Sequence, residues 1–205
     1  MLSAAAGARA GRAVVVVGVA YALVLAAGMV QYGLSVPIGD PILALMEVLT
    51  ITSALPVLVQ FGAFHAGTAP PGRGRSSVAL GFAALFALTT IGVHVFELTI
   101  GRATGRHGLV WPSVTYAFEL LAWDVLLGLA LVFAAMALPN DDGSRRVRQW
   151  LLATGVCCLL GIIGPLVDNM RLQLIGVFGY AVLLPIAAWV WAGWFRAIGQ
   201  ARQQR

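Results

Sequence analysis

Hydrophobic positions along this chain fall into six long apolar runs that are separated by short polar segments. An α-helix needs about 17–25 predominantly apolar residues to cross the hydrocarbon core of a bilayer, and each run is long enough to do so. The runs cover residues 13–34, 42–64, 77–100, 113–138, 149–167 and 171–195. The pattern predicts an all-α protein, an integral membrane bundle of six transmembrane helices.

The polar segments between the runs are too short to hold a soluble domain, so we expect one transmembrane domain over residues 1–205 with short polar tails. Arg9 and Arg12 before the first run are also typical of a signal peptide. That run continues past Gly28 over a full membrane thickness, which favours a retained first helix.

Composition strengthens this interpretation. Hydrophobic residues make up 60% of the chain and charged residues 10%, with a mean hydropathy of +0.90, whereas soluble domains are about 45–50% apolar. All 13 basic residues are arginines. The absence of lysine excludes a retinal pump and every enzyme that forms a lysine imine.

The arginines indicate an orientation in the membrane, because cytoplasmic loops contain the positive excess. Ten lie on one side of the predicted bundle: Arg9, Arg12, Arg73, Arg75, Arg145, Arg146, Arg148, Arg196, Arg202 and Arg205. The other side has Arg102, Arg106 and Arg171. We therefore expect both termini in the cytoplasm, in a multi-pass protein of the cell membrane such as the bacterial inner membrane. Short basic clusters beside apolar runs favour contact with the lipid bilayer and argue against nucleic acid.

Five ionisable groups lie inside the predicted helices, although each costs at least about 2.5–3.5 kcal/mol at the centre of a bilayer. They are Glu47, His94, Glu97, Glu119 and Asp124. At a rise of about 1.5 Å per residue, Glu47, His94 and Glu119 each lie about 9 Å from the outer boundary. We expect these three to line one pocket that opens toward the outer face, with Asp124 near the midplane.

Helical spacing adds neighbours to this predicted site. Thr90, His94 and Glu97 share one face of the third helix, and Gln31 at the outer end of the first helix could close the ring.

In the fourth helix Tyr116, Glu119 and Trp123 share a face, whereas Asp124 is rotated well over a right angle from Glu119. We therefore expect Glu119 and Asp124 to have different partners. Tyr116, Trp123, Glu97, Thr90 and Gln31 are the predicted substrate-binding residues.

Acid–base chemistry on a hydrophobic substrate is the function that we expect from this constellation. Burial disfavours a charged carboxylate, so Glu119 or Asp124 would act as the acid, and Glu47 or His94 as the base or cation stabiliser. Nearby aromatic rings could stabilise a carbocation. The predicted catalytic residues are Glu47, His94, Glu119 and Asp124, with no cofactor.

An acidic residue in the outer part of the second helix, here Glu47, within a small all-helical membrane protein resembles the integral-membrane terpene cyclases of meroterpenoid and indole-terpenoid pathways. This resemblance is compositional and covers only the region around Glu47. It implies a cyclase or isomerase that acts on an isoprenoid-like substrate. The distinctive stretch of residues 116–124 points to no family of known activity.

Other interpretations of the same residues remain open. They include a buried structural network in which Glu97 pairs with Arg102, a proton- or cation-coupled carrier of small solutes, and a structural subunit of a membrane complex. His94 and Glu97 also have a spacing that can bind one metal ion, with Glu47 and Glu119 completing the set. The carboxylate di-iron pattern needs two Glu-x-x-His motifs, so we expect no metal.

Overall fold

The described part of the chain contains six helices of membrane-spanning length. The computed structural model describes residues 3–33, 37–105 and 109–204. Within them, the helices long and apolar enough to cross a membrane are Ala4–Tyr32, Ile42–Gly67, Pro70–Gly101, Val114–Ala137, Asp142–Leu166 and Met170–Ala201. Each predicted run overlaps one of these helices, which confirms the all-α fold with six apolar helices of membrane-spanning length.

Short turns and π-helical segments subdivide some of these spans. In chain order the elements are α1 (Ala4–Tyr32), α2 (Ile42–Gly67), α3 (Pro70–Phe96), η1 (Glu97–Gly101), α4 (Val114–Leu120), η2 (Leu121–Leu126), α5 (Leu127–Ala137), α6 (Asp142–Gly161), α7 (Ile163–Leu166), α8 (Met170–Phe178), η3 (Gly179–Leu183) and α9 (Leu184–Gln203). The elements labelled η are π-helices, in which each turn contains an extra residue.

Short polar side chains cap the first turns of four helices among the described residues. The Ser3 hydroxyl accepts a hydrogen bond from the amide of Ala6 at the start of α1, and Ser113 accepts one from Tyr116 at the start of α4. Asp141 does the same for Ser144 at the start of α6, and Asn169 does so for Arg171 at the start of α8. Each bond satisfies an amide that has no partner inside the helix.

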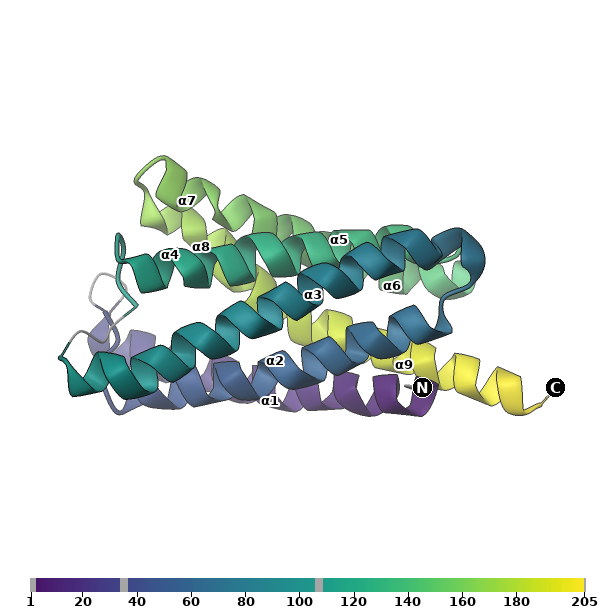
Figure 1. Cartoon of the computed structure of the whole chain (residues 1–205), viewed down its shortest axis with the longest axis horizontal. Helices are drawn as coiled ribbons and strands as arrows, with labels where there is room; N and C mark the ends of the chain where they lie inside the picture. Colours follow the sequence, from purple (N-terminus) through teal and green to yellow (C-terminus); the bar gives the residue numbers. More distant parts are fainter. Residues whose placement is uncertain (1–2, 34–36, 106–108, 205) are drawn as a thin grey trace.

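The spans form a ring in chain order. Each span packs against the next one, and α9 in the last span packs against α1 in the first. Both termini lie at one end of the bundle (Figure 1), which we call the terminal end together with residues 68–69 and 138–141. The opposite end, formed by residues 37–41, 102–105, 109–113 and 167–169, is called the Arg102 end.

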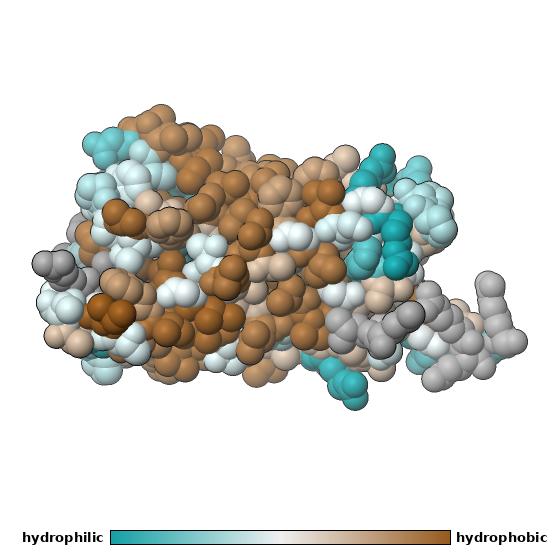
Figure 2. Space-filling view, in the orientation of Figure 1, coloured by the Kyte–Doolittle hydropathy of each residue, from teal (hydrophilic) through white to brown (hydrophobic). Residues whose placement is uncertain are grey.

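Hydrophobic side chains cover the middle of the molecule, and hydrophilic ones gather toward its two ends (Figure 2). Large apolar residues such as Leu23, Leu55 and Leu88 are more than half exposed. Such an apolar belt would be unfavourable in water and matches the hydrocarbon layer of a bilayer. The fold is that of a multi-pass membrane protein.

Aromatic packing fills the terminal half of the bundle. The Trp191 ring lies 5.2 Å from Phe61 and 5.2 Å from Phe64 between ring centroids, and it stacks on Phe195 at 5.8 Å. Nearer the middle, Trp123 lies 4.8 Å from Phe86. Glu47, His94 and Glu97 are buried in the half of the bundle on the Arg102 side, and Asp124 is buried near the middle.

The arginine distribution follows the two ends of the bundle. Arg106 and Arg205, and the side chain of Arg202, lie outside the described residues. The terminal end contains Arg9, Arg12, Arg73, Arg75, Arg145, Arg146, Arg148 and Arg196, and the Arg102 end contains Arg102 and Arg171. The side of the membrane that each end faces stays a prediction.

Candidate functional site

A histidine and a glutamate meet between α3 and α4. His94 Nε2 lies 3.1 Å from Glu119 Oε1, and their side chains are 2% and 15% exposed. The predicted common depth of these two residues is thus confirmed. The second oxygen, Glu119 Oε2, is buried and accepts no hydrogen bond from the described residues.

Glu119 also lines a cavity of about 230 Å³ in the Arg102 half, which we call the Glu119 cavity. Its walls come from α1, α2, α4, α8 and η3, and from residues 37–38 and 109–110 of two loops. Its polar lining consists of Tyr21, Tyr116, Glu119, Gln173 and Tyr180. The remaining lining is hydrophobic, including Leu25, Met29, Leu43, Met46 and Val177. An apolar pocket with a few convergent polar groups is the usual form of a small-molecule site.

The expectation that Glu47, His94 and Glu119 all line one pocket is wrong for two of the three. Glu47 and His94 are not among the residues that line the Glu119 cavity. His94 forms a hydrogen bond with Glu119 and is 2% exposed, and Glu47 is completely buried in an ion pair with Arg102. Of these three residues, only Glu119 can therefore contact a molecule in this cavity directly.

Arg102 joins the first half of α2 and the loop before it to η1 at the Arg102 end. Its Nη1 donates to Glu47 Oε2 at 2.7 Å and to the backbone carbonyl of Glu97 at 2.8 Å. Its Nε and Nη2 donate to the two carboxylate oxygens of Asp40 at 3.1 and 2.8 Å. These bonds, first of all those to Asp40, raise the pKa of Arg102 above its usual range and keep it charged.

The predicted structural pairing of Arg102 with Glu97 needs correction. The ion-pair partners of Arg102 are Glu47 and Asp40, while Glu97 contributes its backbone oxygen. Glu97 begins the π-helical η1 and Arg102 follows it directly, so the wide turn brings the guanidinium back over the Glu97 carbonyl. Asp40 was not predicted, although an acid next to the start of the second span is a usable signal.

Asp124 lies deeper and has different neighbours from Glu119, as predicted. It is completely buried in η2. A Cβ atom added at Gly161 or Gly176 would come within 2.8 or 2.4 Å of its Oδ1 atom. The two glycines thus let α6 and α8 close around this carboxyl group. Neither oxygen accepts a hydrogen bond of normal geometry from the described residues.

Three π-helical segments lie next to this region. They contain Glu97, Asp124 and Tyr180 respectively. Single π turns within α-helices occur frequently at functional sites, because they re-aim side chains at the cost of regular hydrogen bonding. The α-helical spacing used for prediction did not include them.

The remaining predicted substrate-binding residues lie at different places in the bundle. Tyr116 lines the cavity, and Trp123 packs between Phe86 and Tyr180, with its ring centroid 5.1 Å from that of Tyr180. Thr90 is completely buried on the His94 face of α3. Gln31 is exposed near the end of α1, and the structure does not bring it to the cavity.

Tyr21 and Gln173 were missed by sequence reasoning. Gln173 is 3% exposed and donates a hydrogen bond to the Tyr180 hydroxyl at 3.3 Å. An isolated polar residue within an apolar span was the available signal for both. Both lie in helices that contain none of the five ionisable groups Glu47, His94, Glu97, Glu119 and Asp124.

Two further observations bear on the class of site. Among residues 3–33, 37–105 and 109–204, no three His, Cys, Asp or Glu side chains come together in a way that would hold a metal ion. No family model, no curated protein and no solved structure matches the chain. A function for this chain therefore has to be inferred from the geometry of the site.

Proposed function

We propose that this chain is a membrane enzyme in which Glu119 acts as a general acid on a lipophilic, isoprenoid-like substrate held in the Glu119 cavity. One observation supports the proposal above all. Glu119 Oε1 is fixed by His94 at 3.1 Å, while Oε2 is buried without a partner among the described residues in a side chain that lines an apolar cavity. A buried polar atom without a partner is costly, so its retention favours a role in binding or catalysis.

The proposed reaction is an acid-initiated cyclisation or isomerisation. The Oε2–H group of Glu119 gives its proton either to an alkene carbon, which uses the π bond, or to an epoxide oxygen, whose C–O bond then breaks to give a hydroxyl group; either way a carbocation is left on the substrate and a carboxylate on Glu119. The His94 Nε2–H group stabilises that carboxylate through Oε1. A proton then returns from the substrate to Glu119, so the enzyme and the atom count of the substrate are restored.

The tyrosines of the cavity supply the second part of the proposed chemistry. Tyr21, Tyr116 and Tyr180 line the same space as Glu119. Their ring faces attract a cation by roughly 0.5–2 kcal/mol each when water is excluded. Apolar walls exclude water, which protects a carbocation from being captured as an alcohol.

We place the Arg102 end on the outer side of a cell membrane and both termini in the cytoplasm. The arginine excess at the terminal end supports this orientation. The Glu119 cavity then lies in the outer half of the bilayer, and residues 37–38 and 109–110 close its outer side. A lipophilic substrate would reach it from the membrane.

The test is a turnover assay on purified protein in lipid nanodiscs. Polyprenylated aromatic compounds and their epoxides are offered in D₂O, and products are analysed by mass spectrometry. We expect a cyclised or isomerised product, which contains one carbon-bound deuterium when the group protonated is an alkene. Glu119→Gln should abolish it, whereas Asp142→Asn, an exposed carboxylate in the first turn of α6, should not. A product that forms equally with Glu119→Gln would refute the acid role.

A proton-coupled carrier is the second candidate, because Asp124 is a completely buried carboxyl group that does not line the Glu119 cavity. In that case Asp124→Asn would abolish solute-driven proton uptake into proteoliposomes, and Glu119→Gln would leave it in place. The enzyme proposal predicts no such uptake.

A further inference from the structure

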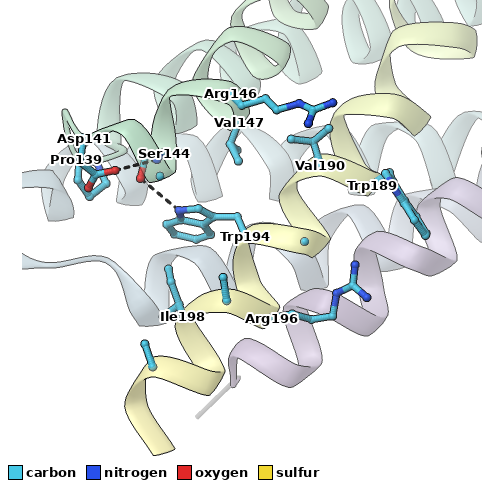
Figure 3. A pocket seen from close by; sticks show the side chains of 14 residues that line it. Pro139, Asp141, Ser144, Arg146, Val147, Trp189, Val190, Trp194, Arg196 and Ile198 are labelled. Atoms are coloured by element: carbon cyan, nitrogen blue, oxygen red, sulfur yellow. Dashed lines mark hydrogen bonds between the residues drawn. The ribbon is translucent and has the colours of Figure 1, made fainter. Parts of the chain in front are cut away.

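A wide groove lies far from Glu119, at the terminal end between α6 and α9 (Figure 3). It has a volume of about 750 Å³, and we call it the α6–α9 groove. Val147, Val190 and Ile198 give it an apolar floor. Gly193 keeps it open, because a Cβ atom added there would meet nothing nearer than Arg196 Nη2 at 3.9 Å.

Two arginines, Arg146 of α6 and Arg196 of α9, line this groove, and both are exposed. Arg196 lies over the Trp189 ring, with its Cζ atom 5.8 Å from the ring centroid. Among the described residues, neither arginine forms an ion pair with a carboxylate within 4.0 Å. Their guanidinium groups can therefore bind an anion without first breaking an ion pair.

Other groups at this end already have structural roles. Arg75 donates a hydrogen bond to the backbone oxygen of Met136, and Arg148 donates one to that of Leu138. These two arginines therefore connect α3 and α6 to the end of the fourth span. Asp141 lines the groove as well, but its Oδ1 accepts the Ser144 amide that begins α6. An anion in the groove would thus face two positive charges and one engaged carboxylate.

The groove continues into the lipid-facing surface of the last span. Ile186 and Trp189 share a face of α9 by their i, i+3 spacing, and Val182 lies about one turn earlier in η3; the three residues are 38%, 53% and 42% exposed. This stripe runs from the middle of the membrane to the arginines. Trp194 marks the interfacial level, and its indole nitrogen donates to the Ser144 hydroxyl at 3.1 Å.

We propose that the α6–α9 groove binds an anionic membrane phospholipid. Its phosphate lies between Arg146 and Arg196, and its acyl chains lie along the stripe from Trp189 to Val182. Guanidinium groups bind phosphate oxygens in pairs of parallel hydrogen bonds. Basic pockets between transmembrane helices are suited to anionic headgroups. The combination of two available arginines with a continuous apolar stripe favours a lipid over a soluble anion.

The experiment measures lipid binding to the full chain in detergent by native mass spectrometry. The probes are a phosphatidylglycerol and a phosphatidylcholine with the same acyl chains. We expect the phosphatidylglycerol to bind more tightly. In the double variant Arg146→Gln/Arg196→Gln its affinity should fall about 25-fold, or about fivefold for each arginine near an anionic headgroup.

Two further variants separate a specific site from general attraction. Arg9→Gln/Arg12→Gln removes the same charge from exposed positions of α1 at the same end, outside the groove, and should leave affinity unchanged. Gly193→Leu keeps both arginines and fills the groove, so it should weaken binding. Equal losses in the two arginine double variants, or no preference for phosphatidylglycerol, would overturn the proposal. So would inorganic phosphate competing as strongly as the lipid.

Discussion

His94 of α3 and Glu119 of α4 are joined by a hydrogen bond of 3.1 Å between Nε2 and Oε1, at the edge of a cavity that only the glutamate reaches. The imidazole fixes one oxygen of the carboxyl group, and the other oxygen is buried without a hydrogen-bond partner among the described residues. Because Glu119 lines the cavity and His94 only holds Glu119 in place, Glu119 is the candidate catalytic residue and His94 a positioning residue.

Replacement of the acid should remove turnover without removing the fold. We expect Glu119→Gln to lower kcat by about 10²–10⁴-fold, which is the usual contribution of general acid–base catalysis. The amide keeps the size of the side chain and can still accept a hydrogen bond from His94. Thermal unfolding in detergent measures the fold in parallel, and an unfolded Glu119→Gln variant would count against a purely catalytic role.

His94→Gln should affect kcat more than KM. The variant loses the imidazole that orients Glu119 but leaves the lining of the cavity intact. Steady-state kinetics would show an unchanged KM with a reduced kcat, because an interaction needed mainly in the transition state has been removed. A large rise in KM with an unchanged kcat would mean that His94 serves substrate binding instead.

Arg102 should be important for stability. Arg102→Gln leaves Glu47, which is completely buried, without its ion-pair partner, and removal of one partner from a buried pair costs about 3–5 kcal/mol. Because Arg102 is 21% exposed, we expect a value near the lower limit. The double variant Glu47→Gln/Arg102→Gln should be less destabilised than Arg102→Gln alone. Thermal unfolding midpoints in detergent provide the measurement, and strictly additive losses would argue against a coupled pair.

The contact between Asp124 and two glycines predicts a position-specific steric effect. A methyl group at Gly176 would lie 2.4 Å from Asp124 Oδ1, so Gly176→Ala should destabilise the protein by about 1–3 kcal/mol. Adding Asp124→Ala should recover part of the loss. Gly81→Ala is the matched control, since nothing lies within 4 Å of its added Cβ. If both glycine variants unfold at the same temperature, α6 and α8 do not close around Asp124.

Labelling of single cysteines tests the orientation. In a background with Cys157 and Cys158 replaced by serine, Gly74→Cys should react with a membrane-impermeant maleimide only after permeabilisation of the cells. Ala103→Cys should react in intact cells. Both positions are exposed at opposite ends of the bundle. The reverse pattern would invert the proposed topology.

Sequence patterning was sufficient for the architecture and for part of the site. The lengths of the apolar runs fix the spans, because the bilayer thickness sets the length of each helix. The depth argument also brought His94 and Glu119 together, because a straight helix places residues at predictable heights. The other features of the site depend on how the helices and loops pack against one another.

The π turns explain several of the missed features. They depend on packing between helices, and no local residue pattern encodes the extra residue in the turn at Glu97 or Asp124. The position of Arg102 follows from such a turn. Its partner Asp40 lies in a loop, and the path of a loop cannot be predicted from helical spacing. Tyr21 joins the cavity only because α1 closes the ring against the last span.

Carbodiimide labelling is the most direct measurement of the central claim, that Glu119 acts as a general acid at a lipophilic cavity. Dicyclohexylcarbodiimide enters apolar sites and adds to protonated carboxyl groups, and peptide mass spectrometry locates the adduct. We predict an adduct on Glu119 that accompanies loss of turnover and is absent in the Glu119→Gln variant. Labelling confined to Asp124, with Glu119 unmodified, would contradict this account and favour the carrier.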